Sequence, residues 1–323
     1  MKLYVRAFCI AIASVCFAPF AGAQSYPEKA VRLIVPFAPG GSTDIMARLL
    51  GARLSEPLRQ PVIVDNRGGA GTLVGTEIAA RTPPDGYTLL MTNIAFSLNP
   101  GLHGKKLPYD PVRDFAAITL IASQPTVLAV HPSLPVKTVA DLVRLAKQKP
   151  GELSFASSGI GGVGHIAGEM FKTATGTKLI HVPYKGGGPA VIDLVTGQVM
   201  VAFIGMPTAM AHAKAGKIRF VAVTDGRSAS AAPDVPTIAQ AGIAGFRVDN
   251  WIGLFAPAQT PQNIVARLHE EVLRVLKQDT VREKLAAQGF EIIGSTPTEF
   301  AALVKSDIDK YTKVIESAAI RAD

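Results

Sequence analysis

Short apolar runs alternate with helical patterns along most of this chain of 323 residues. The runs that predict strands lie at 31–35, 61–65, 87–92, 117–122, 126–131, 153–157, 179–183, 199–204 and 218–224. Helical patterns begin near residues 42, 138, 163, 188, 207, 261, 279 and 297. This alternation predicts an α/β fold with parallel sheets, in which ligands bind in a crevice at the carboxyl ends of the strands.

Three of the expected helices have recognisable start signals. Thr138 and Asp141 have the spacing of a capping box, in which each side chain bonds a backbone N–H of the other residue. Thr260-Pro261 and Thr296-Pro297 each combine a capping hydroxyl with a proline suited to the first helical position. We therefore expect helices to begin at these three places.

Residues 1–23 have the pattern of a secretory signal peptide. Lys2 and Arg6 precede the apolar stretch 7–20, which is too short to anchor the chain in a membrane. Ala21-Gly22-Ala23 matches a cleavage site, so the mature chain is expected to begin at Gln24. This pattern predicts a soluble exported protein, which in a Gram-negative cell lies in the periplasm.

Cysteine content and charge further limit the kinds of protein that this chain can be. Cys9 and Cys16 both lie within the predicted signal peptide, and neither sits in a lipobox, so the mature chain has no disulfide and no lipid anchor. The formal net charge is +8, but the basic residues are scattered, with no run longer than Lys105-Lys106. A nucleic-acid partner would require clustered basic residues, whereas scattered positive charge raises the local concentration of anions.

The first candidate binding turn is Pro36-Phe37-Ala38-Pro39-Gly40-Gly41-Ser42-Thr43-Asp44, between a predicted strand and a predicted helix. A helix start has unpaired N–H groups and a partial positive charge, and glycines allow close backbone approach. Together these properties suit an anion such as a carboxylate. Phe37, Gly41, Ser42 and Thr43 are candidate ligand contacts, and Asp44 is expected to cap or orient the turn. The alternative is that Ser42, Thr43 and Asp44 only cap the helix.

A second turn of the same kind connects the strand at 153–157 to a helix. Its candidate contacts are Ser157, Ser158, Gly159, Gly161 and His165. Gly159, Gly161 and Gly164 also satisfy G-x-G-x-x-G, so a dinucleotide-binding enzyme is an alternative. Against it, residues 179–188 lack the acidic residue that would bind the ribose hydroxyls.

Three further places supply candidate contacts. The turn Tyr184-Lys185-Gly186-Gly187-Gly188-Pro189 opens another helix, and Tyr184 is expected to place an aromatic wall beside the ligand. Thr92 and Asn93 end one predicted strand, and Gly205 and Met206 follow another. We expect all of these positions to lie at the same crevice.

Residues arranged for catalysis are scarce in the sequence. No G-x-S-x-G motif occurs, and the six histidines are dispersed without a pair at metal spacing. His165 and Glu169 are four residues apart, but a third metal ligand is not evident. The sequence therefore predicts binding without turnover, and neither a metal nor a cofactor.

With these turns in place, the chain resembles the Bug family, the TctC-like periplasmic receptors of tripartite tricarboxylate transporters. The stretches that carry the resemblance are 36–44, Val64-Asp65-Asn66-Arg67-Gly68-Gly69-Ala70-Gly71, Pro84-Asp85-Gly86-Tyr87-Thr88-Leu89-Leu90, Val182-Pro183-Tyr184-Lys185-Gly186-Gly187 and Trp251-Ile252-Gly253-Leu254-Phe255-Ala256-Pro257. The resemblance implies a two-lobed, type II periplasmic-binding-protein fold. It also implies that the turns at 37–44 and 157–165 clamp a ligand carboxylate, partly through ordered water.

One departure from the family pattern affects the expected ligand. Many relatives have an aspartate at the end of the strand that corresponds to 199–204, where this chain has Ile204. An acidic group that could meet a ligand ammonium or hydroxyl is therefore absent. We expect a carboxylate without an amine, either a dicarboxylate or an aromatic acid.

The expected organisation is a signal peptide at 1–23, a first lobe built from 24–124 and 226–323, and a second lobe built from 125–225. The expected function is the capture of a small carboxylate for uptake by membrane subunits of a tripartite tricarboxylate transporter, or for sensing. The protein is expected to be a monomer with no nucleic-acid partner. An exported enzyme and a structural protein with a vestigial cleft are the alternatives.

Overall fold

The structure, a computed structural model, describes residues 26–318 and 320–321. The predicted signal peptide at 1–23 and the mature start at Gln24 lie outside the described residues. Within those residues, no helix has both the length and the apolar character needed to cross a membrane.

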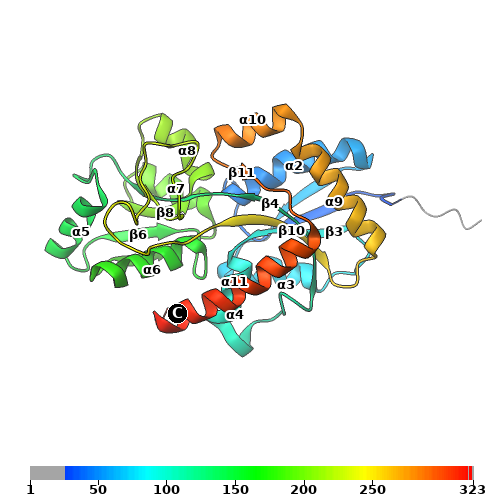
Figure 1. The fold of residues 1–323 in the computed structure, drawn as a ribbon, viewed down its shortest axis with the longest axis horizontal. Coiled ribbons are helices and arrows are strands. Elements are labelled where there is room, and N and C mark those ends of the chain that lie inside the picture. The colour runs from blue at the N-terminus through cyan, green and yellow to red at the C-terminus, as the bar shows by residue number, and fades with distance from the viewer. Residues whose placement is uncertain (1–25, 319, 322–323) are drawn as a thin grey trace, which may run out of the picture.

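The protein has two lobes, each built around its own sheet (Figure 1). The first sheet has the order β11-β4-β10-β3-β1-β2. Its strands are β1 (Val31–Val35), β2 (Val62–Asn66), β3 (Thr88–Asn93), β4 (Phe115–Ser123), β10 (Trp251–Pro257) and β11 (Glu291–Ile292). The second sheet has the order β7-β6-β8-β5-β9. Its strands are β5 (Thr126–Val130), β6 (Ser154–Ser157), β7 (Ile180–Pro183), β8 (Val201–Gly205) and β9 (Arg219–Val223).

The chain passes between the two sheets twice, through residues 124–125 and through residues 224–250. The two crossing segments are hydrogen-bonded to each other, since Gln124 N–H donates to the Asn250 carbonyl at 3.0 Å. The membership of the sheets agrees with a first lobe made of two separate parts of the chain. The exact lobe boundaries, expected after residues 124 and 225, stay a prediction.

Helices pack on both faces of each sheet because buried side chains alternate along the strands. Leu33 and Leu254 face α2 (Ser42–Leu58), α9 (Gln262–Leu276) and α10 (Asp279–Ala287). Ile34 and Phe255 face α3 (Leu73–Ala80), α4 (Ala95–His103) and α11 (Pro297–Ser317). The second sheet lies between α5 (Val139–Gln148) and α6 (Val163–Thr175) on one face, and α7 (Gly187–Val195) and α8 (Met206–Lys214) on the other.

The expectation of parallel sheets holds for β1 with β2 and β3 and for β6 with β7 and β8, but not for the other strand pairs. Strand β10 runs antiparallel to both β3 and β4, and β5 runs antiparallel to both β8 and β9. Strands β5 and β10 each start at a crossing segment, so they enter their sheet at the end where most neighbouring strands finish. The short edge strand β11 is also antiparallel to its neighbour β4. The sequence analysis also missed β10 as a strand and missed α3 and α4 as helices.

Two of the three helix-start signals are confirmed. Thr138 and Thr296 cap α5 and α11 through complete capping boxes, with Asp141 and Glu299 as their partners. At the third, α9 begins at Gln262 as expected, but Thr260 does not cap it: the N-cap is Pro261, and the Thr260 hydroxyl donates to the Pro257 carbonyl at 2.7 Å.

Close packing of β10 on α11 depends on a glycine. A Cβ atom at Gly253 would overlap the fully buried ring of Phe300. By contrast, a Cβ at Gly51 in α2 would make ordinary contact with the Val62 carbonyl oxygen at 3.4 Å and with the Val64 side chain at 3.6 Å. The two sites thus form a matched pair of buried glycines.

We predict that Gly253→Ala lowers the free energy of unfolding by about 1–3 kcal/mol, because the added methyl overpacks the core. Gly51→Ala, the control, should leave this free energy unchanged or raise it, because alanine favours the helix. Urea unfolding of both variants measures the difference. Equal stability of the two variants would contradict the packing argument.

Candidate functional site

The turns that connect strands to helices meet between the two lobes. The Ala38 N–H of the first lobe donates to the Lys185 carbonyl of the second lobe at 2.8 Å. The hydroxyls of Ser42 and Thr208 are 2.9 Å apart across the same gap. The turn at 36–44 therefore touches the second lobe directly, and the lobes are closed on each other.

A small inner pocket of about 20 Å³ lies behind these contacts. Its lining comes from both lobes and both crossing segments: Phe37, Gly41, Ser42, Thr43, Asn93, Gln124, Ser158, Val163, Gly187, Gly205, Thr208 and Asn250. None of these side chains is ionisable. The pocket therefore has polar walls that carry no formal charge.

Four helices begin at the inner pocket, namely α2, α6, α7 and α8. Their N-cap residues are Gly41, Gly162, Gly186 and Gly205, and none of the four has a side-chain cap hydrogen bond. The capped helices α5 and α11 start elsewhere. Helix starts carry partial positive charge and N–H groups without intrahelical partners, so this arrangement suits an anion. At α8 the Met206 N–H already donates to the Pro125 carbonyl at 2.8 Å and Pro207 has no N–H, so this helix contributes mainly its dipole.

Asp44 holds the backbone of the first turn in place through hydrogen bonds and does not face the inner pocket. Its carboxylate accepts hydrogen bonds from Gly40 N–H and from Asn66 Nδ2, both at 2.9 Å, and pairs with Arg48 at 3.0 Å. The residue is buried and does not line the inner pocket. Its negative charge is thus held by its own surroundings, away from the pocket.

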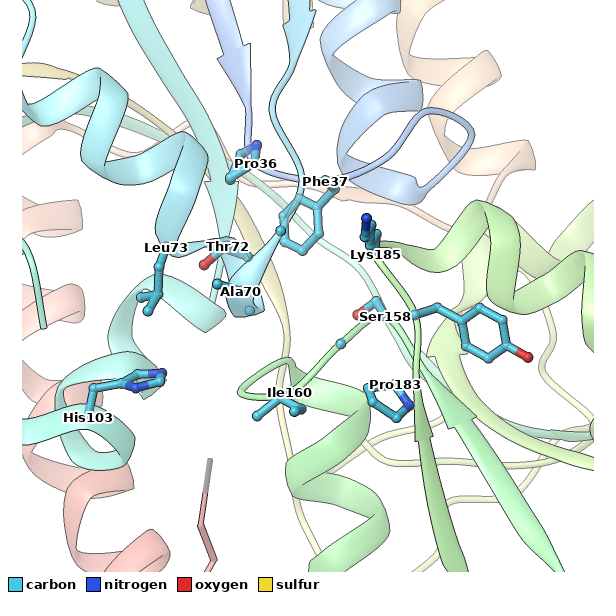
Figure 2. Close-up of a pocket in the computed structure, with 14 residues that line it drawn as sticks. Pro36, Phe37, Ala70, Thr72, Leu73, His103, Ser158, Ile160, Pro183 and Lys185 are labelled. Atoms are coloured by element: carbon cyan, nitrogen blue, oxygen red, sulfur yellow. The ribbon is translucent and has the colours of Figure 1, made fainter. Parts of the chain in front are cut away.

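A larger outer cavity of about 270 Å³ lies beside the inner pocket. Phe37 and Ser158 line both spaces, so the two adjoin. The remaining lining residues are Pro36, Gly69, Ala70, Gly71, Thr72, Leu73, His103, Gly159, Ile160, Pro183, Tyr184 and Lys185. Figure 2 shows Phe37, Ile160 and Pro183 around this space, with His103 across from Ser158. Basic side chains but no acidic ones line it.

One wall of the outer cavity is an unusual backbone loop, which the sequence analysis did not place at the site. Four successive residues have positive φ: Gly69 (142°), Ala70 (44°), Gly71 (61°) and Thr72 (83°). Asn99 holds the loop, donating from Nδ2 to the Thr72 hydroxyl at 3.1 Å. Such φ values are costly for Ala and Thr and concentrate at ligand-binding sites.

Several predicted contacts line neither space. Thr92, Asp44, Ser157, Gly161, His165 and Met206 are absent from both linings. The Ser157 hydroxyl lies 2.7 Å from His181 Nε2, within the second lobe. The Met206 side chain packs toward Gly289 of the first lobe instead. The Ser157 and Met206 side chains thus have partners other than the two spaces.

Two stacked imidazoles support the second turn. The rings of His165 and His181 lie parallel, 4.4 Å apart, and His165 Nδ1 accepts a hydrogen bond from Gly161 N–H at 3.2 Å. Burial lowers the pKa of His165, and it lowers the pKa of His181 to about 3, with the neighbouring ring as a second cause. Both rings are therefore neutral at neutral pH and act as structural supports of the glycine turn.

Tyr184 lines the outer cavity, but its hydroxyl donates to Asp193 at 2.6 Å. It therefore contributes a ring surface rather than a free hydroxyl. The sequence analysis missed Gln124, Val163, Gly187, Thr208 and Asn250 at the inner pocket and His103 at the outer cavity. Gln124 and Asn250 had one available signal, since both lie where the chain crosses between lobes.

Residues 46–320 match the family model described as the tripartite tricarboxylate transporter family receptor. The chain belongs to this family. It is 34% identical to Protein BugT of Bordetella pertussis over 313 residues, which cover 97% of this chain and 96% of BugT.

Two solved structures share the architecture closely. One is Rpa4515 of R. palustris with adipate, with 38% identity and a TM-score of 0.88, covering 92% of this chain and 99% of that one. The other is the periplasmic binding protein BugD, with 33% identity and a TM-score of 0.88, covering 92% of this chain and 99% of that one. The resemblance inferred from the sequence is confirmed, as is the two-lobed periplasmic-binding-protein fold.

The chain is accordingly a solute-binding receptor and not an enzyme, and the dinucleotide-binding alternative is rejected. The third glycine of its G-x-G-x-x-G pattern has a packing role in this structure. A Cβ at Gly164 would overlap the Phe203 carbonyl, so the glycine lets α6 lie directly against β8.

Closure of the lobes depends on another glycine. A Cβ at Gly188, near the start of α7, would collide with the Pro39 carbonyl of the opposite lobe, although the Gly188 backbone conformation accepts any residue. We predict that Gly188→Ala folds normally but weakens ligand binding roughly five- to a hundredfold, because the methyl opposes closure. Calorimetry with a carboxylate that stabilises the unmodified protein measures this loss.

Small-angle scattering of the same variant should show less compaction with saturating ligand. Gly51→Ala serves as the control, because its methyl lies against β2 within the first lobe. Undiminished compaction in Gly188→Ala would show that this contact does not govern closure.

Proposed function

We propose that this receptor captures a small carboxylate without an amine, either a dicarboxylate or an aromatic acid, between its two lobes. The observation that carries the proposal is the convergence of four uncapped helix starts on one pocket without charged side chains. A carboxylate there accepts hydrogen bonds from both lobes at once, which couples binding to closure.

The residues that line the outer cavity also fit this ligand class. Phe37, Leu73 and Ile160 offer apolar surface to a ring or a methylene chain. Lys185 offers a positive charge to a second carboxylate. His103 offers an imidazole that is neutral at neutral pH, because burial lowers its pKa. The binding of adipate by the similar Rpa4515 is consistent with a dicarboxylate of this length.

A ligand ammonium is disfavoured by the same surroundings. Neither space is lined by Asp or Glu, and the nearby Asp44 carboxylate already has three partners. Burying a cation without a counter-charge costs several kcal/mol. The cleft is therefore unsuited to an amino acid.

We further propose that the protein works in the periplasm as a monomer, after removal of residues 1–23. Family membership supports the compartment, and the pattern of the first 23 residues supports cleavage. Delivery to the membrane subunits of a tripartite tricarboxylate transporter, or use in sensing, completes the proposed role.

Thermal unfolding with a ligand panel tests the ligand class. We predict that at least one of adipate, succinate and benzoate raises Tm, because a ligand at 100 times its Kd stabilises the folded state by about 2.7 kcal/mol. The corresponding amides, which keep the shape but lack the negative charge, should have no effect. Sodium chloride at matched ionic strength is the salt control.

Two outcomes of the panel would contradict the proposal. Stabilisation by aspartate or glutamate alone would mean that the cleft holds an ammonium. The absence of any ligand-linked stabilisation would favour a structural protein with a vestigial cleft.

Export has its own test. We predict that the protein expressed in a Gram-negative host is recovered from the periplasmic fraction and starts at Gln24, because cleavage follows Ala23. N-terminal sequencing and intact mass measure this. Recovery of a membrane-bound, acylated form would contradict it.

A further inference from the structure

A third space lies behind the segments through which the chain crosses between the lobes. It has a volume of about 440 Å³, and the crossing segments and the first lobe line it. We call it the hinge cavity. In the first sheet, β3, β1 and β2 lie on one side of β4 and β10, which continue into the crossing segments, and β11 lies on the other side. The binding pockets adjoin the first group, whereas the hinge cavity adjoins β11.

The crossing strands thus separate the cleft from the hinge cavity. In the second sheet, β8, β6 and β7 likewise lie on one side of β5 and β9, to which the crossing segments connect. A rotation about these strands that closes the cleft must widen the hinge cavity on the opposite side. The lobes are closed in this structure, so opening of the cleft would narrow the hinge cavity.

Four carboxyl groups and two guanidinium groups line the hinge cavity. Three of these carboxyl groups have a strong partner. They are Asp249, paired with Arg247 at 2.8 Å, Glu291, paired with Arg227, and Asp307, which accepts a hydrogen bond from Trp251 Nε1 at 2.9 Å. The fourth carboxyl group belongs to Asp225, which has no ion pair within the described residues.

The surroundings of Asp225 favour its neutral form. The Thr224 hydroxyl lies 3.4 Å from its carboxyl, but the single hydrogen of this hydroxyl is directed to the Val248 carbonyl at 2.9 Å. Burial, with the negative charges of Asp249 and Glu291, raises the pKa of Asp225 to about 8. At neutral pH the Asp225 carboxyl therefore carries a proton in the closed state.

The other charged and titratable groups nearby do not supply a counter-charge. Arg247 and Arg227 are held by their own carboxylates, and Lys310 lies 3.9 Å from Asp249. Burial raises the pKa of the Tyr311 hydroxyl, so this group stays neutral. Ionised Asp225 would consequently face a cavity whose other acidic groups already use the available cations.

Asp225 and Glu291 belong to parts of the molecule that move relative to each other. Asp225 directly follows β9, and the neighbouring Thr224 N–H donates to the Thr126 carbonyl of β5 at 2.9 Å, so Asp225 moves with the second lobe. Glu291 lies in β11, which pairs with β4, so it moves with the first lobe. Opening of the cleft therefore brings these two carboxyl groups closer together, and two like charges then repel more strongly.

We propose that ionisation of Asp225 favours the closed state of the lobes and thereby strengthens ligand binding. The proton acts as a regulator at the back of the hinge, outside both binding pockets. The inference requires lobes that move but no particular ligand, so it goes beyond the proposed function.

The direction of the pH dependence follows from the repulsion. Because Glu291 is nearer in the open state, the pKa of Asp225 is higher in the open state than in the closed state. Well below both values Asp225 is protonated in both states, and pH does not affect binding. As the pH rises through the closed-state pKa of about 8, the closed state is favoured and the affinity increases until the open-state pKa is passed.

Calorimetry of adipate binding to the chain that starts at Gln24 tests the inference. From about pH 7 to about pH 9.5 the affinity should rise roughly three- to tenfold, which corresponds to a difference of about 0.5–1 between the two pKa values. Measurements in two buffers of different ionisation enthalpy should show that binding releases protons within this pH range.

Three variants assign the effect. Asp225→Asn, which resembles the protonated form, should bind adipate at both pH values as the unmodified protein does at about pH 7. Glu291→Gln should reduce the rise in affinity, because it removes the charge across the cavity. Asp114→Asn is the matched control: it removes a half-buried carboxylate outside the hinge cavity, and the Arg113 guanidinium holds the pKa of Asp114 below its usual range. It should retain the full rise.

Small-angle scattering without ligand gives a second readout. The unmodified protein should be more compact at about pH 9.5 than at about pH 7, and Asp225→Asn should not change. If adipate binds, an affinity that is independent of pH, that falls as the pH rises, or that rises equally in Asp225→Asn would overturn the inference and leave the receptor function intact. If adipate does not bind, scattering decides: compaction at high pH that is lost in Asp225→Asn supports the inference, and its absence overturns it.

Discussion

The positive ends of four helices that start at one pocket are the constraint on which this architecture depends. The helix α2 starts in one lobe, and α6, α7 and α8 start in the other, all at one pocket. Each helix leaves its first N–H groups without intrahelical partners, and glycine at each N-cap supplies no substitute. When the lobes close, the partial positive charges at these helix starts come together and repel one another. An anion bound between them is attracted to all four helix starts and offsets this repulsion. Closure and anion binding are coupled by electrostatics as well as by shape.

Glycine at the interface between lobes serves a second purpose, which is close backbone approach. Side chains at Gly188 or Gly71 would collide with carbonyl groups of the opposite lobe, at Pro39 and Ile160 respectively. The lobes consequently meet through backbone surfaces, as in the bond from Ala38 N–H to the Lys185 carbonyl. Contacts of this kind tolerate little displacement, so a ligand that holds the turns in the wrong relative position would prevent them from forming.

The sequence predicted which turns meet between the lobes but not the direction of each side chain. The turns at 36–44 and 157–165 were identified because glycine, serine and threonine between an apolar run and a helix have a clear local meaning. Ser157 lines neither space because successive strand residues face opposite sides, and its register is fixed by pairing with Pro183 of β7. The loop at 69–72 and the amides of Gln124 and Asn250 have no local signature, since tertiary contacts alone bring them to the cleft. The same is true of β10, whose antiparallel pairing follows from where the chain re-enters the first sheet.

Because of the position of β10, the two lobes need different parts of the chain to complete their sheets. All strands of the second sheet come from residues 126–223, one continuous stretch. The first sheet has β10 at its interior, between β3 and β4, although residues 251–257 follow the entire second lobe in the chain. Until that strand is present, β3 and β4 have no neighbour on their facing edges. A chain that emerges from a membrane in order from its N-terminus therefore supplies every strand of the second lobe before the first lobe can close its sheet.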